Sequence, residues 1–502
     1  MKRVLVAIAV FVIATAPVRS DEIQLPDMGA TSSSRLSPEE ERQLGEAFMR
    51  RVRQNLDLVQ DPQIEQYVWN LGYYLVANSD YRTRPFHFFV VKDPSINAFA
   101  GPAGHIGVHT GLILTTESES ELAAVMAHEI AHVGQHHLDR AITAAEKMSL
   151  PTAGALLAAI ILGAKDANLA EAAIAATLAA NIQTQLNFTR AHEMEADHIG
   201  IRILSEAGFD PRAMATFFER LQQNDRLYDN EVPEFLRTHP VTTTRIAESR
   251  SRAENYTSDE TRDSTLYYLM RARTRVLTHD NPYELIRSYQ AQLQDGRYKN
   301  RLAVRYGYAL SLSKGGRQDD ARKQLKTLIK EDRERIPYVI ALAEVEIAAG
   351  NLDHALDIFA DGLRLNPRNM PLTRHYAQAL LLARKPGRAK ELLEQYTRHA
   401  TPAPADYQLL AKASRQAGLT GEAYRALAEY HYLLGDTQTA ITYLNRALKQ
   451  EDINERESRV IKARLKELQE VSMLQQDTAE NRRQITPKEK ARTLQAPGAP
   501  AS

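Results

Sequence analysis

A repeat of 34 residues in the C-terminal half constrains the fold of this chain more than any other feature of its sequence. Two series of alanines keep this spacing: Ala309, Ala343, Ala377 and Ala411 form the first, and Ala321, Ala355, Ala389 and Ala423 form the second. Small residues are needed where neighbouring helices approach closely, so their fixed spacing indicates stacked pairs of helices. The sequence therefore predicts a helical repeat architecture for this half.

Turn residues follow the same period. Gly316, Gly350 and Gly418 share it, with Arg384 in place of glycine in the third unit, and Pro337 lies 34 residues before Pro371. A helix–turn–helix period of this length is typical of tetratricopeptide repeats. We expect an α-solenoid of such repeats over residues 264–475, whose concave surface binds segments of other proteins.

The N-terminal half contains the pattern His-Glu-x-x-His at residues 128–132. Positions i and i+4 share one face of a helix, so His128 and His132 project together and can each give one nitrogen to a zinc ion. Glu129 can then reach a metal-bound water as general base. His136 is one further step of four residues, but it lies a turn further along the helix axis, so we do not expect it to be a ligand.

A carboxylate-rich segment at residues 190–200 offers a third ligand. If the segment is helical, Glu193 and Asp197 share one face and Glu195 points elsewhere. One carboxylate from this face would leave a fourth position open for water, as in hydrolytic zinc enzymes. An acidic helix taken alone is usually a solvated surface, but the upstream motif favours the metal site.

Composition limits the chemistry that is available. The chain has 63 basic and 63 acidic residues, a balance that gives no indication of nucleic-acid binding. It has no cysteine, which excludes disulfides, a cysteine nucleophile and a thiolate metal site. Any zinc site must therefore consist of histidine and carboxylate ligands.

The N-terminus predicts export. Lys2 and Arg3 precede an apolar run over residues 4–16, and small or branched residues precede a cleavage point after Ser20. We expect a signal peptide over residues 1–20, with an uncleaved anchor as the alternative, then a leader arm over residues 21–36. The mature protein would be periplasmic in a bacterium with two membranes.

Residues 485–502 are expected to be disordered, and residues 150–180 to form an apolar helical hairpin.

The region between the arm and the repeats, residues 37–255, is expected to be mainly α with a small β-sheet. Helices are predicted to begin at Ser37-Pro38 and at Asp61-Pro62, because a capping side chain is followed by proline at the first helical position. Strands are predicted at residues 85–91, 97–101 and 104–109. His105 and His109 lie on one side of the last strand, where we expect structural roles.

The motifs together resemble the gluzincin family of zinc metalloproteases. The resemblance rests on His128-Glu129-x-x-His132 and on Glu193-x-x-Ala196-Asp197 about sixty residues later. It implies a gluzincin-type protease domain in which His128, His132 and Glu193 bind one Zn²⁺ per chain. Glu129 would be the catalytic base and Asp197 the proton donor.

Two further elements are implied by the same resemblance. His239 would reach the metal and hold the protease latent, and Arg245 stands at the family's arginine position as a residue behind the ligands. Asp197 could instead orient a histidine, as carboxylates near metal sites commonly do. Asn97, Ala98, Phe99 and Ala100 would form an edge strand on which an extended substrate pairs. The alternative for that segment is an ordinary strand.

More narrowly, the chain resembles periplasmic members of this family that have a helical-repeat C-terminal half. This narrower resemblance rests on the segments at residues 25–29, 85–89, 96–100 and 238–240 and covers nearly the whole mature chain. It implies a metalloendopeptidase with chaperone-like activity that promotes assembly of outer-membrane β-barrel proteins and degrades misassembled ones. Partners would be these proteins and their assembly machinery, bound through the repeats, and this is compatible with peripheral association with the outer membrane. The alternative is mainly a chaperone or adaptor with a latent protease. A purely structural zinc protein is disfavoured, because such sites close with four protein ligands and lack a poised glutamate.

Overall fold

The computed structural model describes residues 37–137, 190–227, 233–256, 264–333, 335–400 and 402–473. The predicted signal peptide, leader arm, apolar hairpin and disordered tail lie outside these ranges. Within them, no helix is long and apolar enough to cross a membrane.

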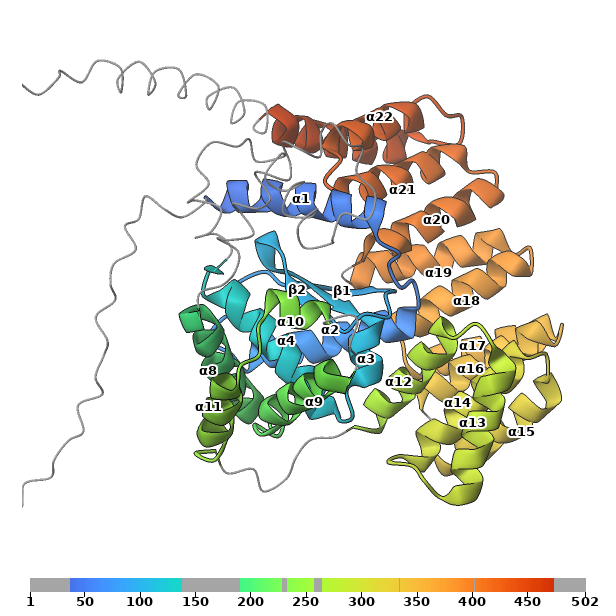
Figure 1. Ribbon diagram of the computed structural model, residues 1–502. Coiled ribbons are helices and arrows are strands. Elements are labelled where there is room, and N and C mark those ends of the chain that lie inside the picture. Colours follow the sequence, from blue (N-terminus) through green and yellow to red (C-terminus); the bar gives the residue numbers. More distant parts are fainter. Residues whose placement is uncertain are drawn as a thin grey trace, which may run out of the picture. The chain divides into compact units, whose positions relative to one another are not determined.

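The first half is mainly helical around one small sheet, as predicted (Figure 1). The elements are α1 (Pro38–Asn55), α2 (Pro62–Ala77), β1 (His87–Val91), β2 (Ala98–Ala100), β3 (His105–His109), α3 (Thr110–Thr115), α4 (Glu119–Gly134), α8 (Arg190–Glu206), α9 (Ala213–Leu227), α10 (Glu234–Thr238) and α11 (Thr243–Ala253). Helices α4 and α8 carry the two predicted ligand segments.

Both predicted helix starts are confirmed, and for the predicted reason. The Ser37 hydroxyl accepts a hydrogen bond from the backbone of Glu40, whose side chain accepts one in return from the backbone of Ser37. Asp61 caps α2 by accepting from the backbone N–H groups of Gln63 and Ile64. These side chains satisfy donors that a helix leaves without an intrahelical partner.

The three strands form a sheet in the order β1-β3-β2. β1 is parallel to β3, with His87 opposite His105, and β2 is antiparallel to β3, with Phe99 opposite Gly107. β2 is therefore an edge strand, and it packs against α4. Asn97 comes immediately before β2 rather than within it.

His105 and His109 take part in packing within this sheet. The His105 ring stacks on that of His87 with centroids 4.8 Å apart, and its Nδ1 lies 2.8 Å from the carbonyl oxygen of Pro102. The Nδ1 of His109 lies 2.8 Å from the Ser95 hydroxyl. Burial lowers the pKa of His105 to about 3 and that of His109 to about 4, so both rings are neutral at pH 7.

The second half is a stack of antiparallel helices, which confirms the predicted α-solenoid. The helices are α12 (Thr265–Thr278), α13 (Pro282–Asp295), α14 (Arg301–Lys314), α15 (Gln318–Glu331), α16 (Ile336–Ala348), α17 (Leu352–Leu365), α18 (Met370–Leu382), α19 (Pro386–His399), α20 (Pro404–Gln416), α21 (Thr420–Leu433) and α22 (Thr437–Ala447). Residues 455–473 are also helical.

The repeated residues occupy the positions that the period predicts. All eight of the spaced alanines are buried where adjacent helices meet. Gly316, Gly350 and Gly418 have φ of 80°, 82° and 80°, the left-handed conformation that glycine adopts without strain. Arg384, the exception in the third unit, has the same left-handed conformation with φ of 54°. The turn of the third unit therefore keeps the left-handed backbone conformation although arginine replaces glycine there.

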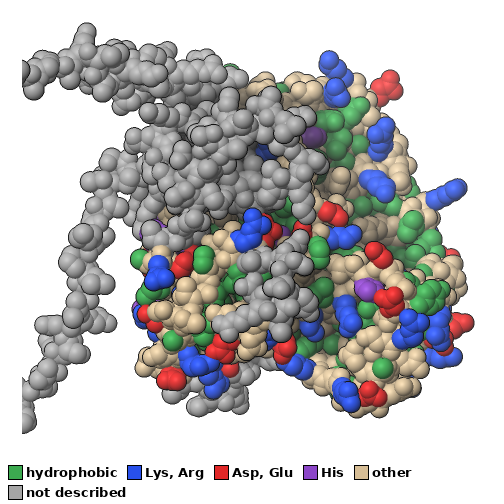
Figure 2. Space-filling model, in the orientation of Figure 1, with side chains coloured by type: hydrophobic (Ala, Val, Ile, Leu, Met, Phe, Trp, Pro, Cys, Tyr) green, Lys and Arg blue, Asp and Glu red, His purple; other side chains and the backbone are tan. Residues whose placement is uncertain are grey.

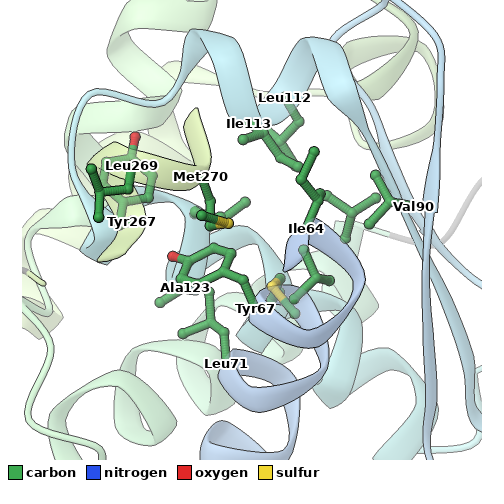
Figure 3. Close-up of a cluster of buried hydrophobic side chains, with 14 of the residues drawn as sticks. Ile64, Tyr67, Leu71, Val90, Leu112, Ile113, Ala123, Tyr267, Leu269 and Met270 are labelled. Atoms are coloured by element: carbon green, nitrogen blue, oxygen red, sulfur yellow. The ribbon is translucent and has the colours of Figure 1, made fainter. Parts of the chain in front are cut away.

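Of the four hydrophobic clusters among the described residues, one is shared by both halves. It extends from Val59 in the first half to Val345 in the repeats. Figure 3 shows Tyr67 and Leu71 of α2 beside Met270 of α12, with Leu112 and Ile113 of α3 nearby. Buried ion pairs also reach α2 from the repeats, because Arg273 contacts Asp61 and Arg374 contacts Glu65, each at 2.7 Å.

The surface of the described part carries both signs of charge. Lysine and arginine side chains lie among aspartate and glutamate side chains on the face drawn in Figure 2, in keeping with the equal numbers of basic and acidic residues.

Candidate metal centre

The His-Glu-x-x-His pattern lies on α4, as predicted. The hydroxyl of Ser118 caps this helix by accepting from the backbone of Glu121, and Glu119 and Glu121 lie in its first turn, where the helix dipole favours them. The alanine-rich sequence lets other elements pack closely on several sides of α4. As a result His128, Glu129 and His132 are 1–2% exposed.

α8 packs directly on α4 and supplies the carboxylate. A Cβ atom at Gly200 would lie 3.3 Å from the backbone nitrogen of His128, so glycine permits this close approach. Glu193 Oε2 is 3.5 Å from the Nε2 of His128, and Glu193 Oε1 is 3.5 Å from the Nε2 of His132. The two imidazoles lie 3.0 Å apart through the same Nε2 atoms.

His239 is brought to the same place by α10, which ends immediately before it. Its Nδ1 is 3.1 Å from Glu193 Oε1 and 3.3 Å from the Nε2 of His128. The ring stacks on Phe235 with centroids 5.0 Å apart. His128, His132, Glu193 and His239 thus form a buried group whose ligand atoms all lie within 4.8 Å of one another.

This group fits a zinc ion in both donor type and spacing. Ligands at about 2.0–2.1 Å from a tetrahedral centre stand roughly 3.3–3.4 Å from each other. The two Nε2 atoms of the α4 histidines lie 3.0 Å apart, and each lies 3.5 Å from an oxygen of Glu193. Nitrogen and oxygen donors without cysteine suit zinc in a catalytic site.

Charged residues surround the ligands. Asp197 Oδ1 lies 2.9 Å from the Nδ1 of His128, and both carboxylate oxygens accept hydrogen bonds of 2.8 Å from Arg245. Arg245 Nη1 also lies 2.9 Å from Glu193. Arg245 therefore holds both Asp197, which faces His128, and Glu193, which faces the candidate metal position.

The electrostatics of the site favour a cation among the ligands, and His128 must give up its proton when a metal binds. Burial and the neighbouring His128 hold the pKa of His132 well below its ordinary value, so this ring is neutral. Burial acts to raise the pKa of Glu193, but His239 and His128 outweigh it and hold that pKa well below the usual range. For His128, burial acts downward, and hydrogen bonds to Asp197 and Glu193 raise its pKa to about 9. Positive charge is therefore stabilised at the position where the ligand atoms converge.

Glu129 differs from the other carboxylates of the site. Burial raises its pKa, and this effect is opposed by His239 and His128. The Nε2 of His239 lies 3.6 Å from its Oε1. The backbone of Ala100, in the edge strand β2, contacts the Glu129 carboxylate and also acts to lower its pKa. A carboxylate with a raised pKa can accept and return a proton near neutral pH.

The structure places a histidine at the site that the sequence motif does not identify. α4 ends at Gly134, and the next turn includes His136 with φ of 55°. The chain then turns back, so that His137 Nδ1 lies 2.9 Å from His132 Nδ1. His136 points elsewhere, with its ring against Arg84. Only its spacing of five residues from His132 could have drawn attention to His137, and that spacing is off-face on a straight helix.

Comparison with known proteins agrees with this geometry. Residues 62–253 match the model of peptidase family M48. The beta-barrel assembly-enhancing protease of Escherichia coli (strain K12) is 33% identical over 459 residues, which cover 91% of this chain and 93% of that protein. The chain belongs to this protease family. The Yersinia pestis member is 32% identical over 448 residues, covering 89% of this chain and 92% of its own.

Another relative matches a shorter stretch of the chain. The mitochondrial metalloendopeptidase OMA1 of Arabidopsis thaliana is 34% identical over 151 residues, which cover 30% of this chain and 28% of that protein. Family membership and the four-residue group together show that this chain is a metalloprotease. The predictions of a protease, of its family and of its fold class are confirmed.

Proposed function

We propose that the chain is a zinc-dependent endopeptidase in which His128, His132 and Glu193 hold one zinc ion. The observation that carries this proposal is the convergence of the two Nε2 atoms and the Glu193 carboxylate at 3.0–3.5 Å in a buried site. When bound there, zinc would polarise the scissile carbonyl and lower the pKa of its water.

Glu129 takes the role of general base in this proposal. It follows His128 directly on α4, and burial raises its pKa toward the range where a carboxylate both takes up and releases protons. Its side chain would remove a proton from the attacking water and deliver it to the leaving amine. Neither step requires a further acid.

Asp197 is better placed to orient His128 than to donate a proton. Its Oδ1 faces His128 Nδ1, and both oxygens accept from Arg245. Hydrogen bonds to the Arg245 guanidinium and to His128 keep the pKa of Asp197 below its usual value although burial acts to raise it, so the carboxylate stays ionised. We assign Asp197 and Arg245 to orientation of the ligands.

The edge strand β2 is proposed as the site of substrate pairing. β2 has β3 on one side only and packs against α4 beside Glu129. An extended peptide could add to such an edge and place its backbone next to the base. A photoreactive residue at Ala100 should cross-link to bound substrate, and absence of this product would argue for an ordinary strand.

The physiological substrates are proposed from the family name and from the repeats. The relatives are named for enhancing β-barrel assembly, and an α-solenoid binds segments of other proteins. We propose that this chain acts in the periplasm on outer-membrane β-barrel proteins and their assembly machinery. It would promote their assembly and degrade those that misassemble. Cell fractionation tests the compartment.

A glutamine in place of Glu129 tests the mechanism. The change keeps the size of the side chain but removes the base, so the Glu129→Gln protein should bind one zinc and lose cleavage by at least about a hundredfold. Zinc content and cleavage of an unfolded outer-membrane β-barrel protein are measured together. Cleavage at the wild-type rate by the zinc-loaded variant would refute the proposal.

A second candidate function is favoured by the position of His239. Its Nδ1 lies within 3.3 Å of both His128 and Glu193, where it could take the fourth zinc position. The resting protein would then act mainly as a chaperone or adaptor through its repeats, with the protease latent. The effect of removing His239 separates this state from a constitutively active protease, as described in the Discussion.

A further inference from the structure

A cavity of about 1840 Å³ lies between the first half of the chain and the repeats. Helices α1 and α2 and strand β1 form one wall, and α20 and α21 form the other. The contact of Glu65 with Arg374 lies at one boundary, and the close packing of Glu46 against Gly435 lies at another. None of the four residues of the candidate metal centre lines this cavity.

The size of the cavity indicates a polypeptide rather than a small molecule. Pockets for small ligands occupy roughly 300–1000 Å³, and this volume is well above that range. The walls expose large apolar side chains that a folded protein ordinarily buries. Tyr73 of α2 is 47% exposed and Leu433 of α21 is 40% exposed, and both line the cavity.

The charges on the walls are unbalanced. Every described carboxylate in the lining has a cationic partner: Glu41 pairs with Arg84, Glu46 with Arg42, Asp57 with Lys92 and Glu65 with Arg374. Arg53 of α1 and Lys412 and Arg415 of α20 also line the cavity. These three cations make no ion pair with any described carboxylate. The walls therefore carry a surplus of positive charge beside apolar surface.

The edge of the sheet in this cavity is already occupied. The carbonyl oxygen of Phe88 in β1 accepts a hydrogen bond from the indole of Trp69, and that of Val90 accepts one from the backbone of Val59. Tyr73 donates to the carbonyl oxygen of Phe86. An occupant therefore cannot extend the sheet at β1, and its side chains must supply the recognition.

We propose that this cavity binds an extended segment of a client polypeptide in which acidic residues alternate with apolar or aromatic ones. The carboxylates would pair with Arg53, Lys412 and Arg415, and the apolar side chains would cover Tyr73 and Leu433. Such a segment neutralises the surplus charge and removes exposed apolar area from water. The inference rests on the proposed function for the existence of a client, but its test does not require cleavage.

Trp69 provides a site-specific readout, because it lines the cavity and is the single tryptophan of the chain. Full-length protein with Glu129→Gln is titrated with three peptides of equal length. All three share phenylalanine and leucine positions and lack tryptophan and tyrosine; their remaining positions are aspartate and glutamate, asparagine and glutamine, or lysine and arginine. The acidic peptide should change the Trp69 emission saturably and bind tightest, and the basic peptide weakest.

Two sets of variants complete the experiment. The triple variant Arg53→Gln, Lys412→Gln and Arg415→Gln should bind the acidic peptide about tenfold more weakly or worse, since three ion pairs are lost. The control triple variant Arg297→Gln, Lys326→Gln and Lys330→Gln removes exposed cations that do not line the cavity. It should bind as the parent does.

A charge reversal tests the sign of the recognition independently. Lys412→Glu with Arg415→Glu should shift the preference from the acidic to the basic peptide. Lys412, Arg415 and the three cations of the control variant are all exposed residues. Circular dichroism should therefore show an intact fold. Equal binding of acidic and basic peptides, or unchanged binding by the cavity triple variant, would overturn the proposal. The test is separate from the cleavage mechanism, because Trp69 emission reports binding and not cleavage.

Discussion

At the scale of single residues, the candidate metal centre is two layers of buried polar side chains. The inner layer is the group formed by His128, His132, Glu193 and His239. Behind it, Asp197 contacts the Nδ1 atom of His128, and His137 contacts the Nδ1 atom of His132. Each α4 imidazole thus has a partner that fixes which nitrogen it turns toward the centre.

Removing His239 tests whether it holds the protease latent. In the His239→Ala protein the fourth position would open to water, so cleavage should rise, by roughly tenfold if the latched state is favoured by about 1.4 kcal/mol. The matched control is His354→Ala, which removes an exposed histidine of the repeats. Peptide cleavage rates at equal zinc loading decide the matter. An unchanged or lower rate in His239→Ala would assign His239 to catalysis or structure.

Zinc affinity separates the two roles considered for Asp197. If Asp197 orients His128, then Asp197→Ala should weaken zinc binding by about 10–100-fold, measured by competition with a chelator. Asp197→Asn should weaken it less, because an amide can still accept a hydrogen bond from the ring. A proton donor would give a different result, namely unchanged zinc affinity with a lower turnover rate at saturating zinc.

The sequence predicts the inner layer better than the outer one. His128 and His132 follow from helical spacing, and Glu193 follows from the family motif, because local periodicity determines which face each side chain takes. The contact of His137 with His132 depends on the turn after Gly134, where His136 adopts a positive φ. The pairing of Arg245 with Asp197 depends on how α11 packs against α8. Neither contact is encoded in a short motif.

At the scale of elements, short-range signals account for most of the fold. Ser37 and Asp61 predict the starts of α1 and α2, and the 34-residue period predicts which alanines are buried in the repeats. The strand β2 is less predictable, because its three residues are too few to show alternation. Its place at the sheet edge is implied by the family resemblance and not by its own residues, and the sheet order β1-β3-β2 shows it.

The turns of the repeats allow a paired test of backbone strain. Arg384 adopts the left-handed conformation that Gly350 adopts in the preceding unit. Arg384→Gly should therefore stabilise the repeats by about 1 kcal/mol, and Gly350→Ala should destabilise them by a similar amount. No heavy atom lies within 4 Å of a Cβ placed at Gly350, so a clash would not confuse the result. Shifts of the denaturation midpoint in the same direction for both variants would contradict this explanation.

At the scale of the whole molecule, the two halves are joined by shared packing. Tyr67 of α2 donates to Glu119 at the start of α4, and Glu119 also accepts from the backbone of Ser264 just before α12. Arg273 of α12 bridges Asp61 and Glu344 at 2.7 and 2.8 Å. The helix that carries the metal motif is thereby connected to the first repeat. Such contacts between residues distant in the chain are the part of the fold that composition and periodicity do not predict.

The location of bound zinc in the full-length protein tests the central claim most directly. Crystals of the zinc-loaded protein are measured at the zinc absorption edge, and an anomalous difference map gives the position of the ion. We predict one peak per chain, about 2.0–2.1 Å from the Nε2 atoms of His128 and His132 and bound by the Glu193 carboxylate. A map with no peak between these three side chains, or with its peak at another site, would contradict the account.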